Sequence, residues 1–214
     1  MVKESFTTFL FDLGSVLIDI DPQATIDSLQ YLFEPTYVHS SVDIFSGEAL
    51  NGGYASDFLN KYQLGKISTR QFINHIKSYC KPGTTDDDII SAWMKMMIGM
   101  DGQTSKFLQD VSAGGFEIYI LSNINELHVE WIRRNIPQLE VAKQCFFSNE
   151  MHLAKPDKEC YEFVLSHTPI IPQQTLYFDD LSPNIEMGEK IGFKSVQVYD
   201  KSWISQAYEI LNTL

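Results

Sequence analysis

The stretch FTTFLFDLGSV, residues 6–16, decides the fold of this chain. Its first six residues are aromatic, aliphatic or β-branched, which is the composition of a buried strand, and Asp12 ends the run. No apolar run of about 18 residues occurs anywhere in the sequence, so neither a signal peptide nor a membrane span is predicted. The first predicted strand, residues 6–11, carries the carboxylate of Asp12 at its carboxyl end.

Toward the C-terminus, short β-branched or aromatic runs alternate with helical patterns. Strands are predicted at residues 116–121, 145–148, 175–180 and 194–199. Helices are predicted at residues 103–113, 126–134, 157–166 and 183–191, with Gly114 and Gly115 closing the first and Gly192 the last. This alternation predicts an α/β fold with an open, mainly parallel Rossmann-like sheet and helices on both faces.

Between the first strand and the rest lies a stretch, from about residue 22 to 100, without a convincing strand. Ser68 with Gln71 fits a capping box, and Thr85 followed by three aspartates fits a helix start. We therefore expect an all-helical cap inserted after the first strand. The predicted domains are a core of residues 1–18 and 101–214 and a helical cap of residues 19–100.

Charge and cysteine content restrict the partners and the compartment. The 214 residues carry a formal net charge of −12, which argues against nucleic-acid partners because these require clustered Lys and Arg. The same charge repels phosphate esters, so a phosphate site here needs a cation or a lysine. Cys80, Cys145 and Cys160 are odd in number and widely spaced, which predicts free thiols and a cytoplasmic protein. The sequence makes no prediction of oligomeric state.

The residues that follow the predicted strands form a coherent polar set. Ligands bind at the carboxyl ends of parallel strands, and there the chain places Asp12, Ser122 with Asn123, Lys155, and Asp179 with Asp180. Carboxylates gathered at one edge repel each other unless a hard cation lies among them, and Mg²⁺ prefers such oxygen ligands. The pattern predicts a magnesium and phosphate site.

Four motifs carry a resemblance to a known family. FDLGSVLIDID, ILSN, AKPD and YFDD, in that order, resemble the signature motifs of the haloacid dehalogenase superfamily, and the helical insert resembles its cap. The FDLG opening, LSNINELH and LGKISTRQF resemble most the bacterial subgroup that contains α-D-glucose-1-phosphate phosphatase. The resemblance implies a phosphoric monoester hydrolase that uses Mg²⁺ and acts on a small phosphorylated metabolite.

The resemblance also implies roles for individual residues. Asp12 is expected to be the nucleophile that takes the phosphoryl group and to be a metal ligand. Ser122 and Asn123 are expected to bind the phosphate, and Lys155 to neutralise it and to position Asp12. The metal ligands are expected to be Asp12, the carbonyl of Gly14, and the pair Asp179 and Asp180.

Gly14 departs from the family pattern, because most phosphatases of the family carry at this position the aspartate that acts as general acid and base. Such a group contributes about 10²- to 10⁴-fold to a rate, so its loss slows catalysis without abolishing it. Asp19, Asp21 and His128 are candidate replacements. We expect Asp19 and Asp21 instead to cap the helix at Pro22, and His128 to pack on its helix.

Three functions remain open at this point. The first is a phosphatase for a sugar phosphate such as glucose 1-phosphate, with Trp93 as a cap contact to substrate or, by its helical spacing, as a core residue. The second is a phosphate-binding protein that has lost turnover with the acid at position 14. The third is a 2-haloacid dehalogenase, against which Asp179 and Asp180 speak, because that reaction needs no magnesium.

Overall fold

A five-stranded parallel sheet organises the chain, with strand order β5-β4-β1-β6-β7. The computed structural model describes residues 6–37 and 57–212. The sheet strands are β1 (Thr8–Phe11), β4 (Glu117–Ser122), β5 (Gln144–Phe147), β6 (Thr175–Asp179) and β7 (Lys194–Gln197). The predicted α/β fold is therefore confirmed, and the strand that contains Phe9 and Phe11 lies at its centre.

Strand β1 explains why the sheet is covered on both faces. Successive side chains of a strand point to opposite faces. Phe9 and Phe11 join one apolar cluster, Leu10 joins another, and all three are fully buried. A strand that is apolar on both sides needs helices on both sides.

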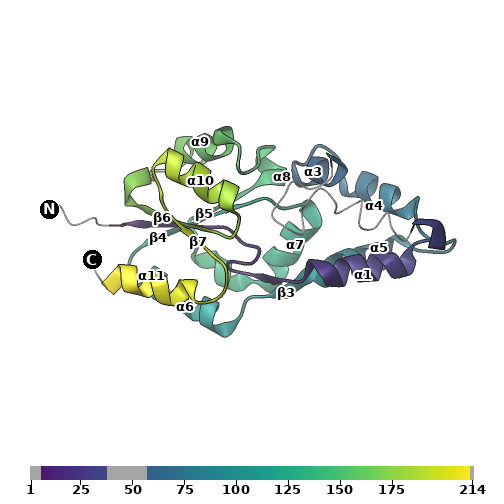
Figure 1. Cartoon of the computed structure of the whole chain (residues 1–214), viewed down its shortest axis with the longest axis horizontal. Coiled ribbons are helices and arrows are strands. Elements are labelled where there is room, and N and C mark those ends of the chain that lie inside the picture. The colour runs from purple at the N-terminus through teal and green to yellow at the C-terminus, as the bar shows by residue number, and fades with distance from the viewer. Residues whose placement is uncertain (1–5, 38–56, 213–214) are drawn as a thin grey trace.

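The helices supply these two layers (Figure 1). Apolar residues of α6 (Gly102–Ala113), α7 (Glu126–Asn135) and α11 (Trp203–Asn212) pack in the cluster of Phe9 and Phe11. Those of α9 (Lys158–Ser166) and α10 (Ser182–Ile191) pack in the cluster of Leu10. The remaining short elements of this part are α8 (Ser148–Met151), η4 (Pro137–Val141) and η5 (Pro172–Gln174).

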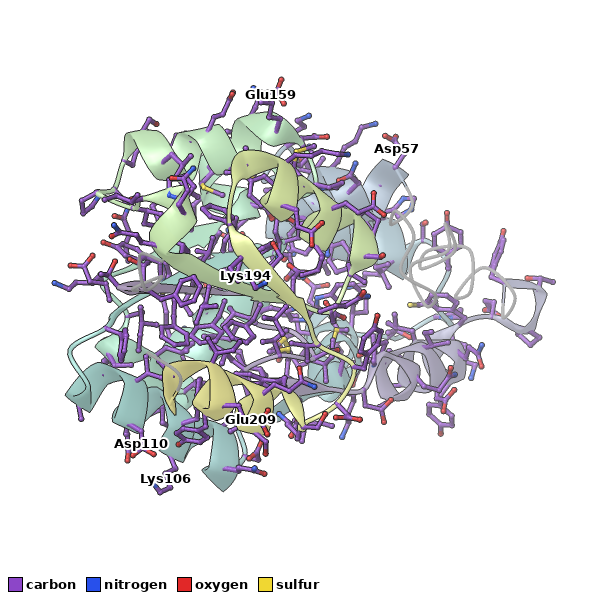
Figure 2. The ribbon with its side chains drawn as sticks, turned by 60° about the vertical axis from the view of Figure 1, so that its left-hand side comes forward. Asp57, Lys106, Asp110, Glu159, Lys194 and Glu209 are labelled. Carbon is purple, nitrogen blue, oxygen red and sulfur yellow. The ribbon has the colours of Figure 1, made fainter. Side chains whose placement is uncertain are left out.

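The outer sides of these helices are charged. Lys106 and Asp110 of α6 point away from the sheet (Figure 2) and form an ion pair of 2.6 Å one turn apart. The predicted stop at Gly192 is confirmed, because it ends α10 in a left-handed conformation with φ of 105°. Helix α11 lies beyond the last predicted strand and was not anticipated.

Between β1 and α6 lies a second unit with a core of its own. Its helical elements are α1 (Pro22–Leu32), η1 (Pro35–Tyr37), α3 (Asp57–Gln63), α4 (Thr69–Lys77), α5 (Asp86–Trp93) and η3 (Met94–Met96). Tyr62, Phe72 and Trp93 are buried together in its centre. The expected capping box of Ser68 is present, and Thr85 forms another with Asp88. Residues 38–56 of the expected cap lie outside the described residues.

This helical unit joins the sheet through two short paired strands, β2 (Asp19–Ile20) and β3 (Met97–Gly99). The expectation that residues 22–100 hold no strand is therefore wrong at β3. Three residues are too few to show a period of two, and their pairing partner lies far away in sequence. The backbone N–H of Asp21 also donates to the carbonyl of Met96 at 2.8 Å, so the entering and leaving chains run side by side.

Among the described residues, none of the helices has the length and apolar character needed to cross a membrane.

Candidate active site

The carboxyl ends of β1, β4 and β6 meet at a cavity of about 320 Å³ that the helical unit covers from the other side. The cavity is lined at the sheet end by Asp12, Gly14, Ser122, Asn123, Lys155 and Asp180. From the helical unit it is lined by Leu59, Asn60, Gln63, Trp93, Met96 and Met97. Every predicted site residue except Asp179 thus lines the cavity, and Asp179 contacts Lys155, which does line it.

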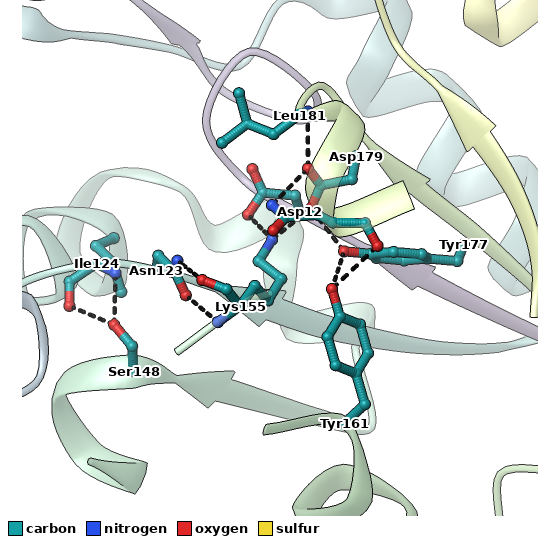
Figure 3. Close-up of polar contacts among 10 residues, drawn as sticks. Asp12, Asn123, Ile124, Ser148, Lys155, Tyr161, Tyr177, Asp179 and Leu181 are labelled. Atoms are coloured by element: carbon teal, nitrogen blue, oxygen red, sulfur yellow. Dashed lines mark hydrogen bonds and ion pairs between the residues drawn. The ribbon is translucent and has the colours of Figure 1, made fainter. Parts of the chain in front are cut away.

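A buried lysine links two of the strand ends (Figure 3). The Nζ of Lys155 donates to Oδ1 of Asp12 at 2.8 Å and to Oδ2 of Asp179 at 2.5 Å. Its side chain is only 1% exposed. Burial alone would lower the pKa of Lys155, but the charges of Asp12 and Asp179 outweigh it, so that the net pKa is raised. The ammonium is therefore permanently charged at the sheet edge.

Asp179 is held entirely by the protein. Besides Lys155, its carboxylate accepts hydrogen bonds from the hydroxyl of Tyr177 at 2.7 Å, the backbone N–H of Leu181 at 2.9 Å and the amide of Asn184 at 2.8 Å. It is fully buried. Both of its oxygens are thus occupied, which separates it from the predicted pair with Asp180 and suits it to positioning Lys155.

Asp12 and Asp180 are the two carboxylates that line the cavity. Burial raises the pKa of Asp12, while Lys155 acts in the opposite direction. Burial, and then the negative charges of Asp12 and Asp179, raise the pKa of Asp180 to about 7. Among the residues that the structure describes, these three carboxylates lie around the one ammonium of Lys155, and a bound cation would relieve their mutual repulsion.

This donor set fits Mg²⁺. No group of three or more His, Cys, Asp or Glu side chains is arranged to hold a metal within residues 6–37 and 57–212. Mg²⁺ does not require one, because it commonly uses one or two protein carboxylates and completes its shell with carbonyls, water and substrate phosphate. Asp12, Asp180 and the backbone of Gly14 at the cavity wall match that demand.

Ser122 is the last residue of β4 and Asn123 follows it, and their side chains have different surroundings. The Ser122 hydroxyl lines the cavity and forms no hydrogen bond with any residue that the structure describes. The Asn123 side chain instead donates to the carbonyl of Lys155 at 2.8 Å and accepts from its N–H at 2.9 Å. Asn123 therefore fixes the backbone of Lys155 next to the strand end, a role that its sequence pattern did not indicate.

The three candidate replacements for the missing acid lie in different places. Asp21 caps α1 as expected, accepting from the N–H of Ala24 at 3.2 Å. Asp19 does not cap that helix but pairs with Lys201 at 2.8 Å, because the β2 strand carries it toward α11. His128 lines the cavity, stacks on Trp93 with ring centres 5.4 Å apart, and burial lowers its pKa to about 4.

Tyr177 and Asn184 hold the Asp179 carboxylate, and the sequence analysis did not single out either of them. Tyr177 lies two residues before Asp179 and so on the same side of β6. Asn184 lies in the first turn of α10, four residues after Asp180. The alternation of β6 and the polar residue after its end were the available signals.

Known proteins resemble this chain over nearly its whole length. A family model described as haloacid dehalogenase-like hydrolase matches residues 6–192. D-ribitol-5-phosphate phosphatase from Bacteroides thetaiotaomicron is 23% identical over 211 residues, covering 95% of this chain and 98% of that protein.

Solved structures share the fold. The structure of a protein from Porphyromonas gingivalis, described as a predicted HAD-like family hydrolase, superposes with a TM-score of 0.81 at 18% identity. The superposition covers 96% of this chain and 98% of that one. A family enzyme from Bacteroides thetaiotaomicron, solved as a complex with magnesium and inorganic phosphate, has a TM-score of 0.74 at 23% identity, covering 90% and 94%.

Proposed function

Because the chain belongs to the haloacid dehalogenase-like hydrolase family, we propose that it is a magnesium-dependent phosphatase that hydrolyses a small phosphorylated metabolite through an aspartyl-phosphate on Asp12. The observation that carries this proposal is the arrangement of Asp12, Lys155 and Asp180 at one end of the cavity. A nucleophile, a fixed positive charge and a carboxylate for a metal are the parts that phosphoryl transfer requires.

Asp12 acts first. One of its carboxylate oxygens attacks phosphorus, the bond from phosphorus to the leaving oxygen breaks, and the leaving oxygen takes up a proton. Water then attacks the same phosphorus, which releases inorganic phosphate and restores the carboxylate of Asp12. A carboxylate nucleophile thereby divides one difficult hydrolysis into two easier displacements.

Lys155 and Ser122 hold the transferring phosphoryl group. The Lys155 ammonium, kept in place by Asp179 at 2.5 Å, neutralises negative charge beside Asp12. The Ser122 hydroxyl donates to a phosphoryl oxygen, and the backbone of Asn123 adds a further contact. These donors are set before substrate arrives, so little reorganisation is needed during reaction.

We assign the metal to Asp12, the carbonyl of Gly14 and Asp180, and assign Asp179 to positioning Lys155. Mg²⁺, when bound, supplies positive charge to the phosphoryl oxygens. The assignment of Asp179 follows from the four hydrogen bonds that its carboxylate already accepts.

Because position 14 is a glycine, it supplies no acid that could protonate the leaving group. His128 is neutral near pH 7, because its pKa lies at about 4, and Asp19 and Asp21 are engaged elsewhere. We propose that the leaving oxygen is protonated by water, which favours esters of good leaving groups such as an anomeric sugar oxygen.

The substrate class is a sugar or polyol phosphate. The cavity of about 320 Å³ suits a small ester, and the similarity to D-ribitol-5-phosphate phosphatase supports this class, within which glucose 1-phosphate is one member to test. We further propose that residues 19–100 act as the cap and residues 1–18 with 101–214 as the core.

Release of phosphate from a panel of esters, with and without Mg²⁺, tests the proposal. The panel includes glucose 1-phosphate, ribitol 5-phosphate and an aryl phosphate, and the native chain is compared with Asp12→Asn. We expect metal-dependent release that is lost in the variant. Tight binding of phosphate esters without any turnover would favour the phosphate-binding protein that Gly14 suggests, and chloride release from a haloacid would favour the dehalogenase.

A further inference from the structure

Two side-chain amides enter the cavity from the cap. Asn60 and Gln63 are three residues apart on α3, so they lie on one face of that helix, and both line the cavity. Both are half-buried, and neither side chain forms a hydrogen bond with any of residues 6–37 or 57–212. Each amide can donate and accept, and both belong to the helical unit, whereas the proposed phosphate site lies at the strand ends.

The end of α3 is fixed to the core, which holds these amides in place. The Ser148 hydroxyl donates to the carbonyl of Gln63 at 2.6 Å, and Nδ1 of His152 donates to the carbonyl of Leu64 at 2.8 Å. Gly65 follows with φ of 62°, and a side chain there would meet the carbonyl oxygen of Asn149 at 2.2 Å. The backbone of the turn therefore lies directly on α8.

A second set of contacts fixes the rotation of α3. The Tyr62 hydroxyl is hydrogen-bonded to Oγ1 of Thr69 at 2.9 Å, and Thr69 in turn donates to the carboxylate of Glu126 at the start of α7. Tyr62 itself is 1% exposed. With Tyr62 turned inward to the cap core, its neighbours Asn60 and Gln63 are directed along the cavity wall.

The rest of the cap wall is apolar. Trp93, Met96 and Met97 line the cavity without a charged group among them. A ligand that fits this space presents hydroxyl groups to the amides of α3 and carbon atoms to the other wall. A short polyhydroxylated alcohol has this distribution of polar and apolar surface, whereas a simple alkyl group offers the two amides no group to hydrogen-bond.

We propose that Asn60 and Gln63 determine specificity by hydrogen-bonding hydroxyl groups of the leaving alcohol, so that the enzyme selects phosphate esters of small polyols and sugars over alkyl phosphates. This inference rests on the proposed phosphatase function and names the residues that select its substrate. It requires no contact of either amide with the phosphoryl group.

The test compares phosphate esters with and without hydroxyl groups, among which ribitol 5-phosphate and pentyl phosphate have chains of equal length. Values of kcat/KM are measured for ribitol 5-phosphate, glucose 1-phosphate and pentyl phosphate with Mg²⁺, using the native protein, Asn60→Leu, Gln63→Met and the double variant. The preference is the ratio of kcat/KM for the hydroxylated ester that is turned over faster to kcat/KM for pentyl phosphate. We expect each substitution to lower this preference about tenfold, because one hydrogen bond contributes roughly this factor. The rate with pentyl phosphate is expected to hold or rise.

Lys61→Met is the matched control. Lys61 lies on the same helix, its side chain is 49% exposed, and it does not line the cavity. It should leave the preference unchanged, and circular dichroism checks that all variants fold. Turnover with a preference that the double variant leaves within about twofold of native overturns the inference alone. Absence of turnover by the native protein of these esters and of an aryl phosphate overturns the proposed function, and the inference with it.

Discussion

The Nζ of Lys155 lies 2.8 Å from Oδ1 of Asp12, although 143 residues separate the two in sequence. Neither side chain is exposed by more than 11%. Charges buried this deeply depend on each other, because each would be costly to bury alone. The contact therefore contributes to the stability of the folded core and also to the proposed chemistry.

Lys155→Met should therefore lose activity and stability together. Removing the ammonium leaves Asp12 and Asp179 buried without their counter-charge, and breaking a buried pair in this way costs about 3–5 kcal/mol. Denaturant unfolding measures the loss. Lys158→Met, which removes an exposed pair with Glu162, is the control and should cost far less. Equal losses in the two variants would contradict this account.

His128 should make stability depend on pH. Its pKa is lowered to about 4 in the folded protein from an ordinary value of 6.5, so its contribution is complete above about pH 6.5 and is lost as pH falls toward 4. Between about pH 7 and pH 5 this amounts to about 2 kcal/mol. His128→Gln should show a smaller decline in unfolding free energy over that range.

Replacement of the exposed His167 by Gln is the comparison for this experiment. This substitution removes one imidazole from the surface, and the unfolding free energy should fall between about pH 7 and pH 5 as much as in the native protein. If His128→Gln declined as steeply as the native protein, burial of this imidazole would not be the cause.

Gly14→Asp should restore a general acid and base. A Cβ at this position would lie 3.3 Å from Cδ1 of Ile20, the flexible end of a side chain, so the substitution fits with a small adjustment. We expect turnover of an alkyl phosphate to rise about tenfold or more, and that of an aryl phosphate to change little, because a good leaving group needs no proton. Gly14→Asn has nearly the same size without an acid and should give no gain, and an equal gain in both variants would refute this explanation.

Gly188→Ala should disturb the support beneath the site. A Cβ there would lie 2.5 Å from the ring of Tyr177, whose hydroxyl donates to Asp179. Overpacking of this kind costs about 1–3 kcal/mol, and the shifted ring should also lower kcat. Gly102→Ala, where the added methyl meets nothing within 4 Å, should keep both the unfolding free energy and kcat at least at native values.

Local sequence patterns predicted much of the sheet. Phe9, Leu10 and Phe11 are apolar on both faces, so their strand had to be central, and the helices after each strand show their own period. Helix α11 and strand β3 escaped prediction. The first lies past the last strand considered, and the second is defined by a pairing partner that no local pattern reveals.

The site was predictable as a set of residue types at strand ends, but not as a geometry. Asp179 and Asp180 are adjacent in sequence and chemically identical, yet only Asp180 lines the cavity. Which of two neighbours turns inward depends on partners such as Tyr177 and Asn184, and these are chosen by packing between β6 and α10. Sequence could not distinguish the positioning carboxylate from the one proposed to bind metal.

The pairing of β2 with β3 has a consequence for how such a protein can diverge. The chain leaves the sheet and returns to it at one place, where the backbone of Asp21 is hydrogen-bonded to that of Met96. The segment between these two residues can therefore be lengthened, shortened or exchanged without altering the order of the sheet strands. Mutations in the inserted unit can therefore change which substrate binds without changing the residues at the strand ends. Related proteins can in this way acquire new substrates and keep the same reacting groups.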